Sequence, residues 1–213
     1  MKVPDMSIDS LTVTTIHIIP GGPMSRLQWG LAGTSSTTLK QKDPNNNVAE
    51  PIPHCKWAHW IDSQHDGPVT DEGDMYPQPD GTVLEKGSMV NPATGLMTDY
   101  EELWMDLESG STTKDEMRWS LVLSLDDKLN RAKGMVIRVG EHVQGIVKND
   151  GRITVERWVW EDSRLGVKDW TRKVRLGDDF LPCSVLFQPE GMHSGGKVRY
   201  GEFWWAIKEL YHW

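Results

Sequence analysis

Hydrophobic and polar residues alternate along most of the chain, and the three-to-four-residue spacing of amphipathic helices is nearly absent. The alternating segments are rich in β-branched and aromatic residues and end at Gly, Pro or Asn clusters, which are typical of turns. We therefore predict strands over Ser10 to Ile19, Arg26 to Thr38, Cys55 to Asp62, Gly81 to Val90, Thr98 to Leu107, Trp119 to Leu125, Met135 to Lys148, Arg152 to Glu161, Leu181 to Phe187 and Lys197 to Trp213.

The remaining segments are read as loops, with little helix. Gln41 to Pro53 is polar and rich in Asn and Pro, and His65 to Asp80 is long and acidic, so both are predicted to be loops. A short stretch around Leu125 to Lys133 is the only plausible helix, and a helical end at Ala206 to Tyr211 is a weaker alternative to a strand.

Many short strands with almost no helix favour an all-β fold. A small polar segment, Ser109 to Lys114, separates two sets of strands of about equal length. The chain of 213 residues is long enough for two small domains of roughly 100 residues each. We therefore predict two small antiparallel β-barrels packed together, with an N-terminal domain over residues 1–112 and a C-terminal domain over residues 113–213.

The clearest predicted hairpin joins Met135 to Lys148 with Arg152 to Glu161. Its turn, Asn149-Asp150-Gly151, suits either a three-residue loop with Gly151 in the left-handed region or a two-residue type I′ turn at Asp150-Gly151. The two choices differ by one residue in register. Because a one-residue shift moves every facing side chain to the other surface, the turn decides which residues meet.

In the three-residue register, one face of this hairpin carries an unusual set of side chains. Alternate residues of a strand share a face, which groups Arg138, His142 and Gln144, and separately Glu156, Trp158 and Trp160. This face is either an ordinary solvated exterior or the lining of a cup. In the second case Trp158 and Trp160 would bind an aromatic ligand while Arg138 or His142 handles its charge, with Gln144 as a further polar contact.

The C-terminal run Tyr200 to Trp213 is also strongly aromatic. As a strand it would place Glu202 and Trp204 on one face, with apolar residues on both faces, as in a strand buried on two sides. If Glu202 is buried beside Trp204, its pKa would rise and the carboxyl could donate a proton. The catalytic candidates are thus His142, Arg138 and Glu202, and the substrate-binding candidates are Trp158, Trp160, Gln144 and Trp204.

Composition narrows the classes of partner. Lys and Arg number 23 against 31 Asp and Glu, which gives a net charge of −8 and argues against nucleic acid. Eleven tryptophans against four tyrosines and three phenylalanines is a strong skew, and indoles serve both cores and the walls of pockets for flat ligands. Mean hydropathy is −0.51, which is ordinary for a β protein whose strands keep one solvated face.

Motifs for common chemistries are missing from the sequence. It contains no glycine-rich nucleotide fingerprint, no phosphate loop, no His-Glu-x-x-His and no Gly-x-Ser-x-Gly, so we expect no cofactor. The histidines are dispersed and the two cysteines, Cys55 and Cys183, have no ligand spacing, so we expect no metal and a reducing setting. No signal-peptide pattern or long apolar run is visible, which predicts a cytoplasmic protein that does not enter a membrane.

Several segments, in the same order over most of the chain, resemble the fungal Hri-type family, which was first named for interaction with a casein-kinase-I-type kinase. They are Leu27 to Thr34 (LQWGLAGT), His59 to Ser63 (HWIDS), Glu85 to Gly87 (EKG), Tyr100 to Trp104 (YEELW), Gly134 to Gly145 (GMVIRVGEHVQG), Arg157 with Glu161-Asp162-Ser163, and Glu202 to Trp205 (EFWW). The resemblance implies a pair of lipocalin-like or calycin-like β-barrels. The chain departs from the family pattern near its start, where Pro-Gly-Gly-Pro interrupts a short approach to Trp29, which would leave a clipped first barrel.

Three functions remain open at this point. Similar small β-barrel proteins include cofactor-free pericyclases of fungal specialised metabolism that perform a hetero-Diels–Alder step on a quinone methide. The first hypothesis is therefore a cofactor-independent enzyme that cyclises, dehydrates or isomerises a hydrophobic or aromatic small molecule. The alternatives are a non-enzymatic adaptor that binds a casein-kinase-I-like kinase, and a lipophile carrier. The sequence also leaves a homodimer open.

Overall fold

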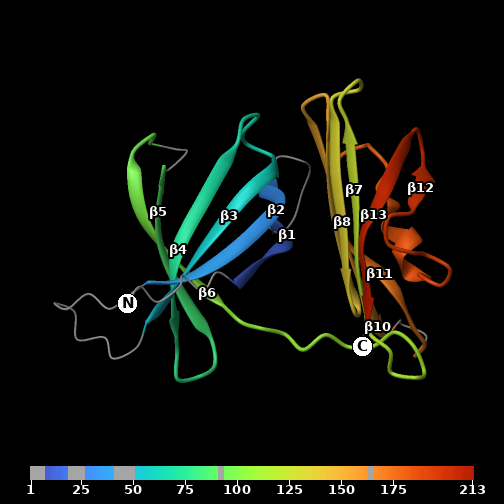
Figure 1. The fold of residues 1–213 in the computed structure, drawn as a ribbon, viewed down its shortest axis with the longest axis horizontal. Helices are drawn as coiled ribbons and strands as arrows, with labels where there is room; N and C mark the ends of the chain where they lie inside the picture. The colour runs from blue at the N-terminus through green and yellow to red at the C-terminus, as the bar shows by residue number, and fades with distance from the viewer. Residues whose placement is uncertain (1–7, 19–26, 41–50, 91–93, 163–165) are drawn as a thin grey trace, which may run out of the picture. The chain divides into compact units, whose positions relative to one another are not determined.

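A computed structural model describes residues 8–18, 27–40, 51–90, 94–162 and 166–213. Figure 1 shows a protein built almost entirely from strands. The elements are β1 (Ile8–Ile18), β2 (Leu27–Lys40), β3 (Ile52–Asp62), β4 (Val69–Pro77), β5 (Val83–Val90), β6 (Met97–Trp104), β7 (Trp119–Asp127), β8 (Ala132–Val139), β9 (His142–Asn149), β10 (Arg152–Asp162), β11 (Lys168–Leu176), the 3₁₀ helix η2 (Pro182–Phe187), β12 (Lys197–Tyr200) and β13 (Phe203–His212).

The strands form two antiparallel sheets, which confirms the all-β prediction. The six-stranded sheet follows chain order from β1 to β6. The seven-stranded sheet has the order β11-β10-β9-β8-β7-β13-β12, so the C-terminal hairpin joins the sheet beside β7. Sequential hairpins account for most of these neighbours, as expected for antiparallel strands joined by short turns.

The chain divides into two compact units. Unit 1 contains Gly33–His59 and Pro68–Leu107 with the start of the chain up to Thr12, and unit 2 contains Val13–Ala32, Trp60–Gly67 and Glu108–Trp213. Strands β1, β2 and β3 thus contribute to both units. Of the described residues, 13–18, 27–32 and 60–67 belong to unit 2, and the domain boundary expected after residue 112 stays a prediction.

Unit 2 holds two hydrophobic clusters on opposite faces of the seven-stranded sheet. One contains Leu121, Leu123, Val136, Val143 and Trp205, together with Leu181, Cys183 and Leu186 around η2. The other contains Val122, Met135, Ile146 and Val155, together with Ile16, Ala32 and Ile61 from β1 to β3. A sheet covered on both faces needs nearly continuous apolar strands, which explains the sequence Leu121-Val122-Leu123 in β7.

Two predictions about the middle of the chain are wrong. The acidic loop predicted over His65 to Asp80 contains strand β4, because its acidic residues are matched by partners on neighbouring strands, as in the contact of Asp74 with His54. The helix predicted over Leu125 to Lys133 is a turn between β7 and β8. There the Asp127 carboxylate accepts the backbone N–H groups of Leu129 and Asn130, a local bond that competes with helix formation.

Two predictions near the C-terminus also change. Leu181 to Phe187 is not a strand, because Pro182 at the first helical position begins the 3₁₀ helix η2. The segment Lys197 to Trp213 is a hairpin rather than one strand, with Gly201 at a φ of 60° in its turn, and the helical alternative is wrong. Residues 41–50 of the predicted loop and the Pro-Gly-Gly-Pro segment lie outside the described residues.

The hairpin around Asp150-Gly151 adopts the two-residue turn. Asn149 pairs directly with Arg152, and both turn residues have positive φ, 46° at Asp150 and 80° at Gly151, as a type I′ turn requires. A second tight turn, Gly140-Glu141, divides the predicted long strand into β8 and β9. The turn at Asp150-Gly151 therefore shifts the pairing of β9 with β10 by one residue from the three-residue register. The turn at Gly140-Glu141 changes which residues of β8 and β9 share a face.

Candidate functional site

The observed register separates the hairpin residues that were expected to share one face. Arg138 pairs with Val143, and Val143 pairs with Trp158, so these three share a face of the sheet. His142 and Gln144 lie on the opposite face, where Gln144 Oε1 accepts a hydrogen bond of 2.6 Å from Arg157 Nε. The shared face predicted for Arg138, His142 and Gln144 is therefore wrong, while the roles proposed for the single residues stay predictions.

Arg138 is 1% exposed and is surrounded by fixed acceptors. Its Nε donates to the carbonyl of Gly140 at 2.9 Å, Nη1 donates to Leu186 O and Phe187 O, and Nη2 donates to Thr112 Oγ1 at 2.5 Å. The guanidinium carbon also lies 5.3 Å from the centre of the Trp170 ring. Burial lowers the pKa of Arg138 to about 10. This arrangement ties β8 to η2 and to the segment before β7.

Trp158 and Trp160 belong to a packed aromatic group in unit 2. Trp158 meets Phe187 edge-on at 5.2 Å and donates its indole N–H to Glu156 Oε2 at 2.8 Å. Trp160 meets Trp170 edge-on at 5.7 Å, and Trp170 stacks on Phe187 at 4.4 Å. Edge-on and stacked contacts of this kind stabilise aromatic groups beyond the area they bury. These rings contact one another and partly cover the core.

The other predicted residues lie apart from this group. Glu202 is exposed in the turn between β12 and β13, so the burial on which its proposed acidity depended is not present. Trp204 is 58% exposed, one residue before the fully buried Trp205. His142 is half-buried, with Nε2 3.7 Å from Glu141 Oε1. The predicted catalytic residues His142, Arg138 and Glu202 therefore do not come together.

A different constellation lies on one face of the sheet in unit 1. Strand pairing brings acidic and aromatic residues of β3 to β6 to this face, because residues that are directly opposite, or two apart on one strand, share a face. We call the set of six residues the acidic–aromatic face. Its members are Trp57, Asp71, Glu85, Tyr100, Glu102 and Trp104.

Glu85 is the centre of the acidic–aromatic face and is 2% exposed. Its Oε1 accepts a hydrogen bond of 2.7 Å from the Tyr100 hydroxyl, and its Oε2 accepts one of 2.7 Å from Trp104 Nε1. The Tyr100 oxygen also lies 3.3 Å from Asp71 Oδ1. Trp104 in turn stacks on Trp57, with ring centres 6.4 Å apart and planes inclined by 13°.

Two glycines make room for this arrangement. A Cβ at Gly73 would lie 2.5 Å from Glu85 Oε1, and a Cβ at Gly87 would lie 2.4 Å from the Tyr100 hydroxyl oxygen. Both distances are shorter than any side chain tolerates without displacement. The positions of Glu85 and Tyr100 therefore require glycine, which has no side chain, at residue 73 in β4 and residue 87 in β5.

Two carboxyl groups of the acidic–aromatic face, those of Glu85 and Glu102, have raised pKa values. Burial raises the pKa of Glu85, and the nearby charges of Glu102 and Asp71 raise it further against the opposing effect of its two hydrogen bonds. Burial also raises the pKa of Glu102, and the charge of Asp71 adds to the effect. Among the described residues, Glu102 has no hydrogen-bond or ion-pair partner for its carboxyl group. The pKa of Tyr100 is raised strongly by burial and by Glu85.

The opposite face of the same sheet has a different character. There Lys56 lies 2.8 Å from Glu72, Lys86 lies 2.6 Å from Glu101, and His54 Nδ1 lies 2.7 Å from Asp74 Oδ1. Acidic residues on this face are matched by cationic ones, whereas Glu85 on the acidic–aromatic face is bound by aromatic donors. Clusters of groups with perturbed pKa values are typical of functional sites, so the acidic–aromatic face is the candidate site.

The sequence carries a signal for this site that the search for catalytic motifs passed over. Tyr100, Glu102 and Trp104 alternate within the predicted strand Thr98 to Leu107, so they had to share a face. Glu85 also lies two residues before Gly87 in a predicted strand. The two predicted strands follow each other in the chain, so their pairing could be expected. The contribution of Asp71 could not, because Asp71 lies in a segment predicted to be a loop.

Neither a metal-binding cluster nor a membrane-spanning helix is found in the described part of the chain. No group of three or more His, Cys, Asp or Glu side chains among these residues is arranged to hold a metal ion. None of the helical segments in residues 8–18, 27–40, 51–90, 94–162 and 166–213 has the length and hydropathy needed to cross a membrane.

Comparison with known proteins places the chain in a family. The crystal structure of the uncharacterized protein YLR301w from Saccharomyces cerevisiae is similar with a TM-score of 0.59 and 19% sequence identity, over 94% of this chain and 87% of the yeast chain. At this identity the likeness concerns the fold alone. No curated protein matches the sequence. The profile of the family described as Protein HRI1 matches residues 6–209, and the chain therefore belongs to the HRI1 family.

Proposed function

We propose that this protein is a cofactor-independent enzyme that uses the acidic–aromatic face of unit 1 to act on a hydrophobic or aromatic small molecule. The observation that carries the proposal is the geometry around Glu85, whose two carboxyl oxygens receive the Tyr100 hydroxyl and the Trp104 indole N–H, each at 2.7 Å. These bonds fix a phenol and an indole beside the half-buried carboxyl groups of Asp71 and Glu102. The proposal retains the class of reaction predicted from the sequence and moves its site from unit 2 to unit 1.

The aromatic members supply the surface for a flat substrate. Trp104 is 37% exposed although its indole N–H is bound to Glu85, so part of its ring is available for contact. Trp57 is half-buried and stacked on it, which keeps the two rings nearly parallel. Rings held in this way bind an aromatic partner with little loss of side-chain freedom.

The acidic members supply proton transfer. Consider a substrate with a benzylic hydroxyl, on the carbon attached to a phenol ring. The Glu102 carboxyl donates its proton to the benzylic hydroxyl, the benzylic carbon–oxygen bond breaks and water leaves. The phenol proton passes to the Asp71 carboxylate, and a neutral quinone methide results. Glu102 and Asp71 then restore their protonation by exchange with water. A raised pKa keeps Glu102 protonated closer to neutral pH, which suits a general acid.

Cyclisation would follow from orientation rather than from further proton transfer. A quinone methide and an alkene held against the Trp57 and Trp104 rings would form two bonds in a hetero-Diels–Alder step that needs no cofactor. Holding two reactants in the reacting geometry supplies a rate gain of many orders of magnitude. In this proposal the Tyr100 hydroxyl, which Glu85 holds in place, would contact the polar end of such a pair.

A screen with product detection tests the proposal. The protein is mixed with a panel of phenolic benzylic alcohols and hydrophobic alkenes, tryptophan fluorescence is recorded, and each mixture is analysed by mass spectrometry for loss of water and for adducts. We expect saturable quenching, a new product, and weaker quenching with Trp104→Phe than with Trp158→Phe. Quenching without product would leave the carrier function, and product formation unchanged by Trp104→Phe would refute the site.

The adaptor function remains a second candidate, because some aromatic side chains are strongly exposed. Trp204 is 58% exposed, Trp213 is 56% exposed and Tyr211 is 63% exposed, all in or beside β13. Large exposed aromatic groups are enriched in protein interfaces, and such a surface would suit a kinase or other protein partner. A direct binding assay with a purified casein-kinase-I-type kinase, compared between the native protein and Trp204→Ser, tests this candidate.

A further inference from the structure

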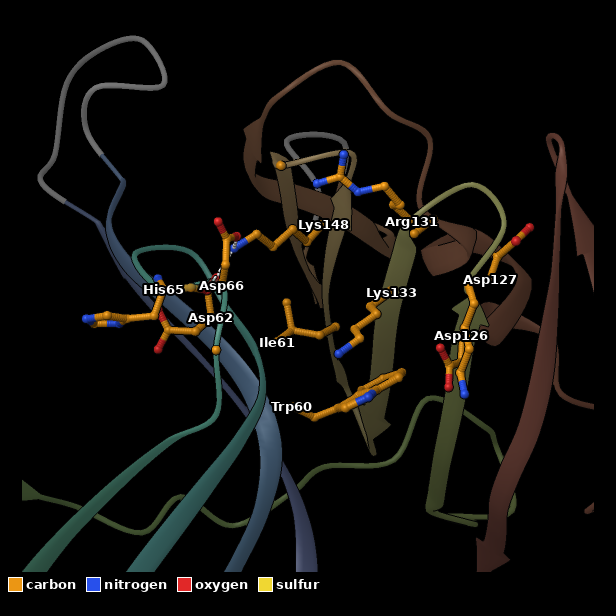
Figure 2. Close-up of a pocket in the computed structure, with 14 residues that line it drawn as sticks. Trp60, Ile61, Asp62, His65, Asp66, Asp126, Asp127, Arg131, Lys133 and Lys148 are labelled. Carbon is orange, nitrogen blue, oxygen red and sulfur yellow. Dashed lines mark hydrogen bonds and ion pairs between the residues drawn. The ribbon is translucent and has the colours of Figure 1, made fainter.

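Charged groups of both signs line a pocket of about 360 Å³ in unit 2 (Figure 2). Lys148 Nζ lies 2.7 Å from Asp66 Oδ1, and Lys133 of β8 lies directly opposite Asp126 of β7 in the strand pairing. Figure 2 shows lysines and carboxylates side by side around the opening. A ligand of either charge would meet groups of both signs there, so this pocket indicates no class of ligand. The acidic–aromatic face of unit 1 is different.

Three carboxyl groups gather on the acidic–aromatic face. Glu85 of β5 lies directly opposite Glu102 of β6, and Asp71 of β4 lies directly opposite Trp57 of β3. The Tyr100 hydroxyl contacts both Glu85 and Asp71. Glu85 is 2% exposed, and Asp71 and Glu102 are half-buried. All three carboxyl groups are thus partly or fully removed from water.

The lysines of the same sheet lie on its other face. The described strands β1 to β6 contain three lysines and no arginine. These lysines are Lys40, Lys56 and Lys86, and each forms an ion pair with a carboxylate of the opposite face. On the acidic–aromatic side of β3 to β6, the one group that can become positive is His59, which is 7% exposed and two residues from Trp57. Three carboxyl groups therefore share this face with at most one positive side chain.

The carboxyl groups of this face act on one another. Burial is the larger cause of the raised pKa values of Glu85 and Glu102, and the charge of Asp71 adds to it in both cases. The charge of Asp71 also contributes to the raised pKa of Tyr100, after burial and the hydrogen bond to Glu85. A positive charge on a bound ligand would relieve this repulsion, whereas a negative charge would add to it.

The aromatic members of the face are also suited to a cation. Among side chains, tryptophan binds a cation over its ring most strongly, and this is the usual way in which proteins bind quaternary ammonium groups. Trp104 is 37% exposed, and its N–H donates to Glu85 Oε2 at 2.7 Å. Donation to a carboxylate leaves more electron density on the indole ring, which favours a cation on its face. Trp57 stacks on Trp104 and extends this surface toward Asp71.

We propose that the acidic–aromatic face binds aromatic amines in their charged ammonium form, with the positive charge over the Trp57 and Trp104 rings beside Asp71. The inference names the substrate class of the proposed function and rests on the site of that function. The phenolic substrate would thus carry an ammonium group in addition to its benzylic hydroxyl. Burial, the main cause of the raised pKa of Glu102, is unaffected by the cation, so Glu102 can still donate a proton.

Two phenols of the same shape test the proposal by isothermal titration calorimetry on the full chain. meta-Hydroxyphenyltrimethylammonium is positively charged, and meta-tert-butylphenol is neutral because carbon replaces the nitrogen. We expect saturable binding of the cation and at least about tenfold weaker binding of the neutral phenol. The anion meta-hydroxybenzoate should bind more weakly than either. Equal binding of the first two, tightest binding of the anion, or no saturable heat with the cation at millimolar concentration would overturn the proposal.

Matched variants locate the positive charge. Asp71→Asn keeps the shape of the side chain and removes its charge, so it should weaken binding of the cation by about tenfold and change binding of the neutral phenol by less than about threefold. Asp71→Glu keeps the charge and should retain most of the affinity for the cation. Glu72→Gln alters the next residue of β4, which is paired with Lys56 on the opposite face, and should bind as the native protein does. Unchanged affinity of Asp71→Asn for the cation would refute the assignment.

This inference and the proposed function can fail separately. Binding that selects the cation and depends on Asp71, without product in the turnover screen, would retain the inference and refute the reaction. Product from neutral phenolic alcohols, with no preference for those that carry an ammonium group, would retain the reaction and refute the inference.

Discussion

Glu85 in unit 1 and Arg138 in unit 2 are both almost completely buried, but their partners differ in kind. Arg138 donates to the backbone carbonyls of Gly140, Leu186 and Phe187. Glu85 receives hydrogen bonds from the side chains of Tyr100 and Trp104. Backbone acceptors can move only if the chain moves, whereas side-chain donors can change partner by rotation about a single bond.

We expect that the hydrogen bonds of Arg138 serve the fold, whereas those of Glu85 position the side chains of the acidic–aromatic face. The hydrogen bonds of Arg138 connect β8, η2 and the segment before β7, so their loss affects the fold. The hydrogen bonds of Glu85 instead determine where a half-buried phenol and a 37% exposed indole point, so their loss affects a surface. Changing each residue in turn tests this distinction.

The largest effect is expected for Arg138→Met. The substitution keeps much of the side-chain volume but leaves several buried carbonyls without a donor, so the free energy of unfolding should fall by about 3 kcal/mol or more. Urea unfolding followed by tryptophan fluorescence measures the change. The control Arg131→Met removes an exposed pair with Asp150 and should cost about 0.5 kcal/mol. Equal effects of the two variants would contradict the role assigned to Arg138.

A smaller loss of stability is expected for Gly134→Ala in β8. A Cβ at this position would lie 2.3 Å from the fully buried ring of Trp205, so the ring or the strand must shift. We expect a destabilisation of about 1–3 kcal/mol. Gly67→Ala, where nothing lies within 4 Å of the added carbon, should be neutral by comparison. Thermal unfolding of both variants decides the point.

A pH-dependent effect is expected for Glu85→Gln. Because the pKa of Glu85 is raised in the folded protein, its contribution to stability is fully present below the ordinary glutamate pKa of about 4.5 and is lost as the pH rises through the folded value. The variant cannot titrate at this position. The unfolding free energy of the native protein, measured relative to the variant, should therefore decrease as the pH increases above about 4.5. Parallel curves of unfolding free energy against pH for the native protein and Glu85→Gln would contradict a raised pKa of Glu85.

The smallest effect is expected on the opposite face of the unit 1 sheet. Lys86 and Glu101 form an ion pair of 2.6 Å, but both side chains are about half exposed. Lys86→Met should change the unfolding free energy by about 0.5 kcal/mol or less, and less still at high salt. A loss comparable to that of Glu85→Gln would mean that the two faces of this sheet do not differ as described.

The sequence predicted the fold class better than the site, for identifiable reasons. The alternation of hydrophobic and polar residues predicted most strands, but it did not predict β4. The acidic residues of β4 form ion pairs with side chains of the neighbouring strand β3, and the sequence of β4 alone does not reveal these partners. The hairpin at Asp150-Gly151 permitted two registers, and only the pairing of Asn149 with Arg152 decides between them. A second turn, Gly140-Glu141, lies inside the segment predicted as one strand, and it places His142 and Gln144 on the face opposite Arg138. The face around Glu85 depends on pairing among β3 to β6, which no single segment encodes.

The most direct test of the assignment to unit 1 compares two variants in one turnover assay. With the substrate found in the screen, the rate of water loss is measured for the native protein, for Glu102→Gln and for His142→Gln. We predict that Glu102→Gln lowers the rate by about a hundredfold or more, as the loss of a general acid does, while His142→Gln stays near the native rate. A rate that falls with His142→Gln and is unchanged with Glu102→Gln would contradict the assignment and return the site to unit 2.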